Sequence, residues 1–290
     1  MPHLREPGRE YILTLSCQDA PGLVYEVSRF LHGFGANIMS SHQLDDRRTG
    51  LFFMRIQFDF VGAVVSVDAL VAAFGEVAVR NTMTFNLVDS ATCTRTLIMV
   101  SRFGHCLNDL LFRHKMGTLN ITVPVVVSNH PDHAALVRSY GIEYLHLPVT
   151  RDTKARAEAA LLDAISRYDI DLVVLARYMQ VLSPETSHAL SGRAINIHHS
   201  FLPSFKGAKP YHQAHDRGVK LIGATAHYIN DDLDEGPIIE QDVVRVDHNL
   251  GPDELVAAGR DVETQVLSRA VQWHSERRVF PNGNRTVVFR

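Results

Sequence analysis

The feature that most constrains the fold is a regular alternation of apolar, strand-like segments with helical segments between Thr96 and His198. The strand-like segments are Thr96–Val100, Val123–Ser128, Tyr144–Leu147, Asp171–Leu175 and Ala194–His198. The helical segments are near Leu107–His114, His133–Ser139, Thr153–Tyr168 and Glu185–Leu190. This alternation predicts a doubly wound α/β fold with a mostly parallel sheet, whose ligands bind at the carboxyl ends of the strands.

The sequence after His198 predicts two further strands, Ile222–Ile229 and Ile238–Val246, and a long helix, Pro252–Glu276. The first ninety residues follow another order. Strands are expected at Tyr11–Ser16, Asn37–Leu44, Leu51–Phe60 and Thr82–Val88, and helices at Leu23–Phe34 and Val65–Val77. The order βαββαβ is that of a ferredoxin-like domain. The polar stretch DSATCT separates the two patterns, so we predict domains at residues 8–90 and 94–290.

Composition excludes several classes of protein. Hydrophobic residues make up 46% of the 290 residues and charged residues 21%, which is ordinary for a globular protein. The net charge of −3 and the lack of a basic stripe disfavour nucleic acid as a partner. The three cysteines are far apart, which favours neither disulfides nor a thiolate zinc site and suggests a reducing cytoplasm. No signal peptide or membrane-spanning segment is expected.

The chemistry-bearing candidates begin at the end of the strand Ala194–His198. Side chains alternate along a strand, so Asn196 and His198 should project to one side while Ile195 and Ile197 pack on the other. An amide can donate to a developing negative charge, and an imidazole can move a proton near neutral pH. The alternative is that both polar residues merely cap a strand at a loop. This pattern alone does not decide between a catalytic role and a capping role.

Two loops follow that could complete a site. The segment Phe201–Ala208 is rich in turn residues and is typical of a pocket wall. Beyond His227, the segment Asn230–Pro237 carries three aspartates and a glutamate. A carboxylate from this loop beside His198 would favour the imidazolium and orient the ring. A solvated acidic loop is the alternative reading.

A metal site is the competing chemical interpretation. His212 and His215 are spaced to share a helix face, and His198 is followed by His199. Adjacent strand residues point to opposite sides, however, and no HExxH or thiolate set is present. We therefore expect no metal.

The combination of Asn196–Ile197–His198, Ser200–Phe201–Leu202–Pro203, His227 and Leu233–Asp234–x–Gly236 resembles the formyltransferases that use formyltetrahydrofolate. The resemblance runs from Thr94 to the C-terminus. It implies that Asn196, His198 and Asp234 are catalytic. It also implies folate contacts and supporting residues. The folate contacts are Tyr178, Met179, Val181, Leu182 and Asp231, and the supporting residues are His199, His227 and Lys206.

The N-terminal segment resembles an ACT domain, a small regulatory module that often binds amino acids. Asp19–x–x–Gly22–Leu23–Val24 and Gly35–Ala36–Asn37–Ile38 carry this match. It implies an effector site at Asp19, Gly22 and Leu23, for which glycine or methionine is a reasonable ligand. A module that only pairs subunits is the alternative, and a homo-oligomer is expected in either case.

An ACT domain joined to a formyltransferase domain is similar to the layout of the 10-formyltetrahydrofolate deformylase family. His199 stands where transferases usually carry Pro, and Lys206–Tyr211 and Asn284–Phe289 are also similar to that family. The resemblance implies hydrolysis of 10-formyltetrahydrofolate to formate and tetrahydrofolate, without a cofactor. This reaction would balance one-carbon pools and supply formate for purine synthesis.

The segment Ser101–Leu107 bears on which molecule accepts the formyl group. In glycinamide ribonucleotide formyltransferases the matching loop is small and cradles the acceptor's phosphate, whereas here it carries bulky side chains. The alternative is that Arg102 or His105 replaces those contacts by charge. Two other functions stay open: a transferase that formylates an amine such as glycinamide ribonucleotide, and a ligand sensor with a degenerate active site.

Overall fold

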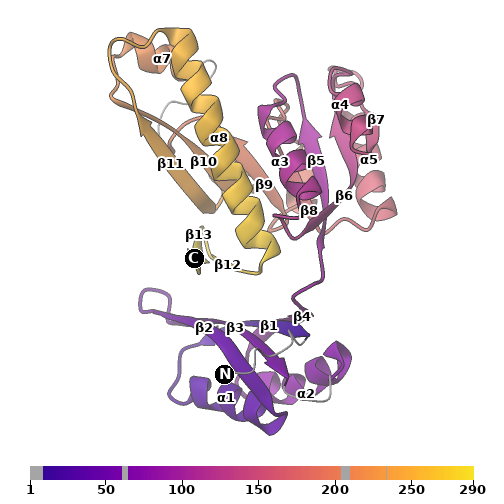
Figure 1. The fold of residues 1–290 in the computed structure, drawn as a ribbon, viewed down its shortest axis with the longest axis vertical. Helices are drawn as coiled ribbons and strands as arrows, with labels where there is room; N and C mark the ends of the chain where they lie inside the picture. The colour runs from indigo at the N-terminus through magenta and orange to yellow at the C-terminus, as the bar shows by residue number, and fades with distance from the viewer. Residues whose placement is uncertain (1–8, 61–64, 204–209, 233) are drawn as a thin grey trace, which may run out of the picture. The chain divides into compact units, whose positions relative to one another are not determined.

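The computed structural model describes residues 9–60, 65–203, 210–232 and 234–290, and Figure 1 shows its helices and strands. The chain divides into two compact units between Cys93 and Thr94. The first unit also takes up Glu276–Phe280 and Val287–Arg290. This differs from the predicted ranges, in which the second domain ran to residue 290.

The first unit has a four-stranded antiparallel sheet covered by two helices. Its elements are β1 (Glu10–Gln18), α1 (Leu23–Gly33), β2 (Ala36–Asp46), β3 (Leu51–Phe60), α2 (Val67–Arg80) and β4 (Thr84–Asp89). The strand order β2-β3-β1-β4 confirms the predicted ferredoxin-like arrangement. Helix α1 begins after Gly22, whose φ of 94° favours glycine, and Ser66 caps α2 by accepting from the Ala69 amide at 3.2 Å.

The C-terminal residues join the first unit through a buried arginine and aromatic contacts. Arg55 is 2% exposed and donates from Nε and Nη2 to the Glu276 carbonyl at 3.1 and 3.0 Å. Phe53 packs against Phe280, and His42 stacks on Phe289. Strands β12 (Val279–Asn282) and β13 (Arg285–Val288), which the sequence analysis missed, pair in a small sheet. These long-range contacts explain why sequence order alone misplaced the segment.

The second unit is built on a seven-stranded sheet in the order β11-β10-β9-β8-β5-β6-β7. Its strands are β5 (Thr94–Val100), β6 (Ile121–Ser128), β7 (Glu143–His146), β8 (Leu172–Leu175), β9 (Ala194–His198), β10 (Leu221–Tyr228) and β11 (Ile238–Arg245). Neighbours from β9 through β7 are parallel, whereas β10 runs antiparallel to both β9 and β11. The prediction of a mostly parallel sheet is therefore confirmed.

Helices pack on this sheet because its strands are apolar on both faces. The helices are α3 (His105–Lys115), α4 (Ala134–Ser139), α5 (Lys154–Arg167), α6 (Pro184–Ala189), α7 (Pro210–Asp216) and α8 (Pro252–Ser275). Helix α5 packs through Leu161 and Ile165 on Leu97 and Met99. Helix α8 lies along β9, β10 and β11 and also packs against α3 (Figure 1).

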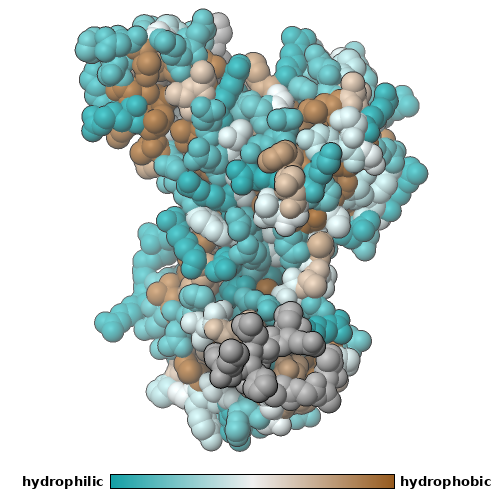
Figure 2. Space-filling view, viewed as in Figure 1, coloured by the Kyte–Doolittle hydropathy of each residue, from teal (hydrophilic) through white to brown (hydrophobic). Residues whose placement is uncertain are grey.

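Hydrophilic residues predominate on the face drawn in Figure 2, and hydrophobic residues form separate patches between them. Among the described residues, no helix has the length and apolar character needed to cross a membrane.

Candidate functional site

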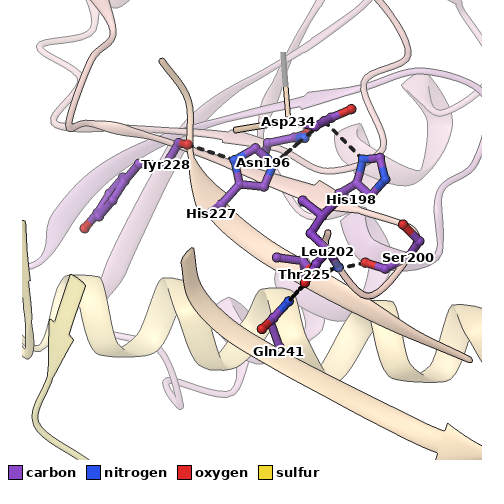
Figure 3. Close-up of polar contacts among 9 residues, drawn as sticks. All are labelled: Asn196, His198, Ser200, Leu202, Thr225, His227, Tyr228, Asp234 and Gln241. Atoms are coloured by element: carbon purple, nitrogen blue, oxygen red, sulfur yellow. Dashed lines mark hydrogen bonds and ion pairs between the residues drawn. The ribbon is translucent and has the colours of Figure 1, made fainter. Parts of the chain in front are cut away.

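The candidate site lies where β9 ends, beside the antiparallel strand β10. Asn196 and His198 face the same cavity, as the alternation along β9 predicts. The register between β9 and β10 places His227 directly opposite Asn196. Asp234 comes from the loop that joins β10 to β11, and its Oδ1 lies 3.0 Å from Nδ1 of His198 and 3.8 Å from Nε2 of His227 (Figure 3).

The backbone of that loop explains how Asp234 reaches the strand end. Asp234 itself has a φ of 60°, which is uncommon for a residue with a side chain. Two residues later, a Cβ on Gly236 would lie 1.7 Å from the Tyr228 carbonyl oxygen, so only glycine permits this close approach. The Tyr228 amide then donates to the Pro237 carbonyl at 2.9 Å. The loop is therefore folded back onto the end of β10.

Asp234 is ionised because of its contact with His198. Burial alone would raise the pKa of this carboxyl, but the hydrogen bond from His198 outweighs burial and holds the pKa well below its usual range. A carbonyl or carboxylate oxygen can only accept, so Nδ1 of His198 must carry the proton shared with Asp234. The opposite nitrogen, Nε2 of His198, has no hydrogen-bond partner within the described part of the chain. It is the nitrogen available to a ligand.

His227 fixes the orientation of the Asn196 amide. Its Nδ1–H donates to the Tyr228 carbonyl at 2.8 Å, so in the neutral ring Nε2 is an acceptor. Nδ2 of Asn196 lies 3.3 Å from that acceptor and donates to it. One N–H of the amide is thereby held, and the other is left to donate elsewhere. The arrangement offers a fixed amide donor beside an imidazole and an ionised carboxylate.

The chain that follows His198 is anchored by a second set of hydrogen bonds, also drawn in Figure 3. The hydroxyl of Thr225 donates to the Ser200 carbonyl at 2.9 Å and accepts from the Leu202 amide at 3.1 Å. The Gln241 amide donates to the Leu202 carbonyl and to the Thr225 hydroxyl. These bonds hold the turn after β9 against β10 and β11, and the sequence analysis did not foresee them.

A cavity of about 360 Å³ opens in front of these residues. Its lining includes the candidate site residues Asn196, His198, Asp234, His199, His227, Tyr178, Met179, Val181, Leu182 and Asp231. Burial raises the pKa of Tyr178 to about 12, so its hydroxyl is a neutral donor. Lys206 lies outside the described residues, and Asp19, Gly22 and Leu23 belong to the first unit.

A buried ionic cluster beside the cavity escaped the sequence analysis. Glu263, on α8, is fully buried and accepts from the Tyr211 hydroxyl at 2.7 Å through Oε1. Its Oε2 lies 2.7 Å from Nε2 of His105 and 3.3 Å from Nε of Arg177. Arg177 follows β8 and lines the cavity. The four residues are far apart in the sequence, so no motif joins them. The one local signal is that Glu263 interrupts the apolar face formed by Val262, Val266 and Leu267.

Ligand atoms of His105, Cys106 and Glu263 lie within 4.8 Å of one another, which is the spacing of a metal site. The chemistry of these donors fits an ion-paired cluster better. Burial raises the pKa of the Cys106 thiol well above its ordinary value, so the thiolate that binds metals is disfavoured. Both oxygens of Glu263 are already occupied by His105, Tyr211 and Arg177.

Gly259 allows Tyr211 to reach Glu263, and its replacement by alanine is expected to destabilise the protein. An added Cβ would lie 2.2 Å from Cζ of Tyr211 and 2.5 Å from its hydroxyl oxygen. Overpacking of this kind costs about 1–3 kcal/mol, and urea unfolding would measure it. Gly75→Ala is the matched control, because its Cβ meets nothing within 4 Å and should stabilise helix α2. An unchanged unfolding midpoint in Gly259→Ala would show that the tyrosine does not pack there.

His199 should make stability depend on pH. Burial, and then the Arg177 cation, lower its pKa from 6.5 to about 4. In the unfolded chain the ring takes a proton at its ordinary pKa, so the stabilisation is full above about pH 6.5 and is lost as the pH falls towards 4. Wild-type protein should therefore lose more stability over this range than His199→Gln in urea unfolding. His188→Gln, at an exposed position, is the control; parallel losses in all three proteins would contradict the prediction.

Comparison with known proteins agrees with this geometry. Residues 94–271 match the model of the family described as formyl transferase. A formyltetrahydrofolate deformylase of Corynebacterium sp. (strain P-1) is 56% identical, over 97% of this chain and 98% of that protein. The crystal structure of the Burkholderia mallei formyltetrahydrofolate deformylase is 54% identical, with a TM-score of 0.93 over 97% of this chain and 100% of that one. A glycinamide ribonucleotide transformylase of Symbiobacterium toebii is 30% identical, with a TM-score of 0.65 over 71% of this chain and 98% of that one. The chain therefore belongs to the formyl transferase family and, within it, to the formyltetrahydrofolate deformylases.

Proposed function

We propose that the chain hydrolyses 10-formyltetrahydrofolate to formate and tetrahydrofolate, with Asn196, His198 and Asp234 as catalytic residues. One observation carries this assignment: an amide, an imidazole and an ionised carboxylate meet at one end of a ligand-sized cavity. The identity of the substrate is inferred from the formyltetrahydrofolate deformylases that match nearly the whole chain. This activity balances one-carbon pools and supplies formate for purine synthesis.

Donors aimed at the formyl oxygen lower the barrier. When water attacks the formyl carbon, the carbonyl oxygen becomes negative. The N–H of Asn196 that His227 does not hold donates to this oxygen. His198, doubly protonated, donates to it from Nε2, because its Nδ1–H is committed to Asp234. Both donors are in place before the reaction, which is what makes such stabilisation effective.

Proton transfer completes the reaction. Asp234 accepts a hydrogen bond from the attacking water and keeps the adjacent His198 in its charged form. The bond between the formyl carbon and N10 then breaks. N10 takes one proton, and the second proton of water is lost as formate forms. Tetrahydrofolate leaves with its N10–H restored.

The folate binds along the cavity wall formed by Tyr178–Leu182 and by the loop at Asp231. Met179 and Val181 are about half exposed, so they offer apolar surface for a flat ring to cover. The half-buried Tyr178 and the exposed Asp231 supply polar groups at the same wall. No cofactor takes part, because the folate is itself the substrate.

The first unit serves as the regulatory part of the protein. A free amino acid such as glycine or methionine binds at the start of α1, near Asp19 and Gly22, and the chain works as a homo-oligomer. Asp19 is exposed, but the Leu23 side chain lies in the core of the unit, so only its backbone can contact an effector. Formate release measured with and without each amino acid, together with the mass in solution, tests this assignment.

The assay that tests the catalytic proposal follows formate from pure protein and 10-formyltetrahydrofolate with no amine present. Formate and tetrahydrofolate should appear in equal amounts and over many turnovers. A transferase would need glycinamide ribonucleotide or another amine before tetrahydrofolate is released, and a sensor would bind the folate without turnover. Either result would refute hydrolysis as the function.

A further inference from the structure

Arg177 is held in an unusual way for an arginine at a pocket wall. Its φ is 64°, in the left-handed region that residues with a side chain seldom adopt. Its backbone is fixed there, because the Arg177 amide donates to the Leu175 carbonyl and the Ser101 amide donates to the Arg177 carbonyl. The side chain is only 9% exposed. A strained backbone and a buried charge at one residue point to a role for its side chain.

The Arg177 side chain contacts two other segments of the second unit, and one of these contacts belongs to a larger cluster. Nε lies 3.3 Å from the fully buried Glu263 of α8. The guanidinium carbon lies 5.6 Å from the centre of the Phe103 ring, in the segment after β5. Tyr211 of α7 donates to the same glutamate, and His105 of α3 binds its other oxygen. The cluster is therefore a connected block of side chains centred on the buried Glu263.

This block continues to the catalytic residues through His199. The His199 ring lies 6.2 Å from the Tyr211 ring on one side and 5.3 Å from the His198 ring on the other, measured between ring centres. Arg177 and His199 both line the cavity that His198 faces. The remaining wall, Tyr178–Leu182 and Asn230–Asp232, takes up the folate under the proposed function. With the folate on that wall, an acceptor would approach the formyl group from the side of Arg177 and His199.

We infer that the Arg177–Glu263 ion pair, with His199 packed in front of it, is the specificity-determining wall that admits water and excludes amine acceptors from the formyl group. This inference rests on the proposed hydrolysis. The cavity, at about 360 Å³, is near the lower end of the range for small-molecule sites, roughly 300–1,000 Å³. An amine carrying a substituent would need the volume that Arg177, Glu263 and His199 fill.

The test opens the wall and offers a small primary amine. Arg177→Gly relieves the positive φ and removes the side chain. Glu263→Gln in the same protein removes the buried negative charge that would otherwise lose its arginine partner. With glycinamide present, the amine nitrogen bonds to the formyl carbon, the bond to N10 breaks, and the proton lost by the amine is balanced by the one N10 gains. The ratio of formylglycinamide to formate should rise at least about tenfold over wild type.

Two further variants separate the wall from other effects. Arg277→Gly is the matched control, because Arg277 also has a positive φ, 57°, but does not line the cavity, so the product ratio should not move. His199→Ala opens the same side without touching the ion pair, so it should also raise the ratio. It keeps the test decisive even when the double variant does not fold.

Three results would overturn the inference: wild-type protein that formylates glycinamide as readily as it hydrolyses, folded variants that keep the wild-type ratio, or an Arg277→Gly protein that shows the same gain. Failure of the proposed function is seen separately, as an absence of formate from the wild-type protein without amine.

Discussion

A folded Asp234→Asn variant is expected to release formate at least about 100-fold more slowly than the wild type, because general acid–base groups contribute roughly 10²–10⁴ in rate. The amide has nearly the size of the carboxylate but carries no charge. It cannot hold His198 as an imidazolium, and it can accept only through one oxygen. Initial rates of formate release at saturating 10-formyltetrahydrofolate measure the effect.

Glu235→Gln is the control for this substitution, since Glu235 is an exposed carboxylate in the same loop and does not line the cavity. It should keep the wild-type rate. Circular dichroism and urea unfolding show whether Asp234→Asn remains folded. A folded Asp234→Asn protein with near-wild-type hydrolysis would rule out the role assigned to this carboxylate.

Asn196→Ala is expected to lower kcat by roughly 10²–10³, the usual effect of removing one donor to an oxyanion. The loss should fall on kcat more than on KM, because the donor binds the charge that develops in the transition state. The substitution also leaves Nε2 of His227 without its partner. Steady-state kinetics of formate release give both constants.

Asn249→Ala removes an exposed asparagine that does not line the cavity and serves as the comparison. It should leave both kinetic constants at their wild-type values. An Asn196→Ala protein that loses affinity but keeps kcat would show that the amide binds the ground state and not the transition state.

Much of the site could be predicted because strands impose simple rules. Alternation along β9 puts Asn196 and His198 on one side, and the structure places both in the cavity. His227 faces Asn196 because β10 pairs with β9 in an antiparallel register. Asp234 needed the family resemblance, since only Gly236 and its close contact with the Tyr228 carbonyl turn the loop back to the strand.

The parts that escaped prediction depend on contacts between distant segments. Glu263 lies 86 residues after Arg177, so the ion pair joins segments that no motif connects, although a glutamate between Val262 and Val266 on the apolar face of α8 hints at burial. The same holds for the C-terminal residues, which Arg55 binds through a backbone carbonyl at position 276. A backbone carbonyl is present at every residue, so no sequence pattern could indicate that partner.

The central claim is that Asn196, His198 and Asp234 direct water onto the formyl carbon of 10-formyltetrahydrofolate. Its most direct test is turnover in water labelled with ¹⁸O, without any amine, followed by mass spectrometry of the formate. One labelled oxygen should enter each formate released by the wild type, at a rate that falls in Asp234→Asn together with product formation. Tetrahydrofolate release without labelled formate, or only after an amine is added, would contradict the account.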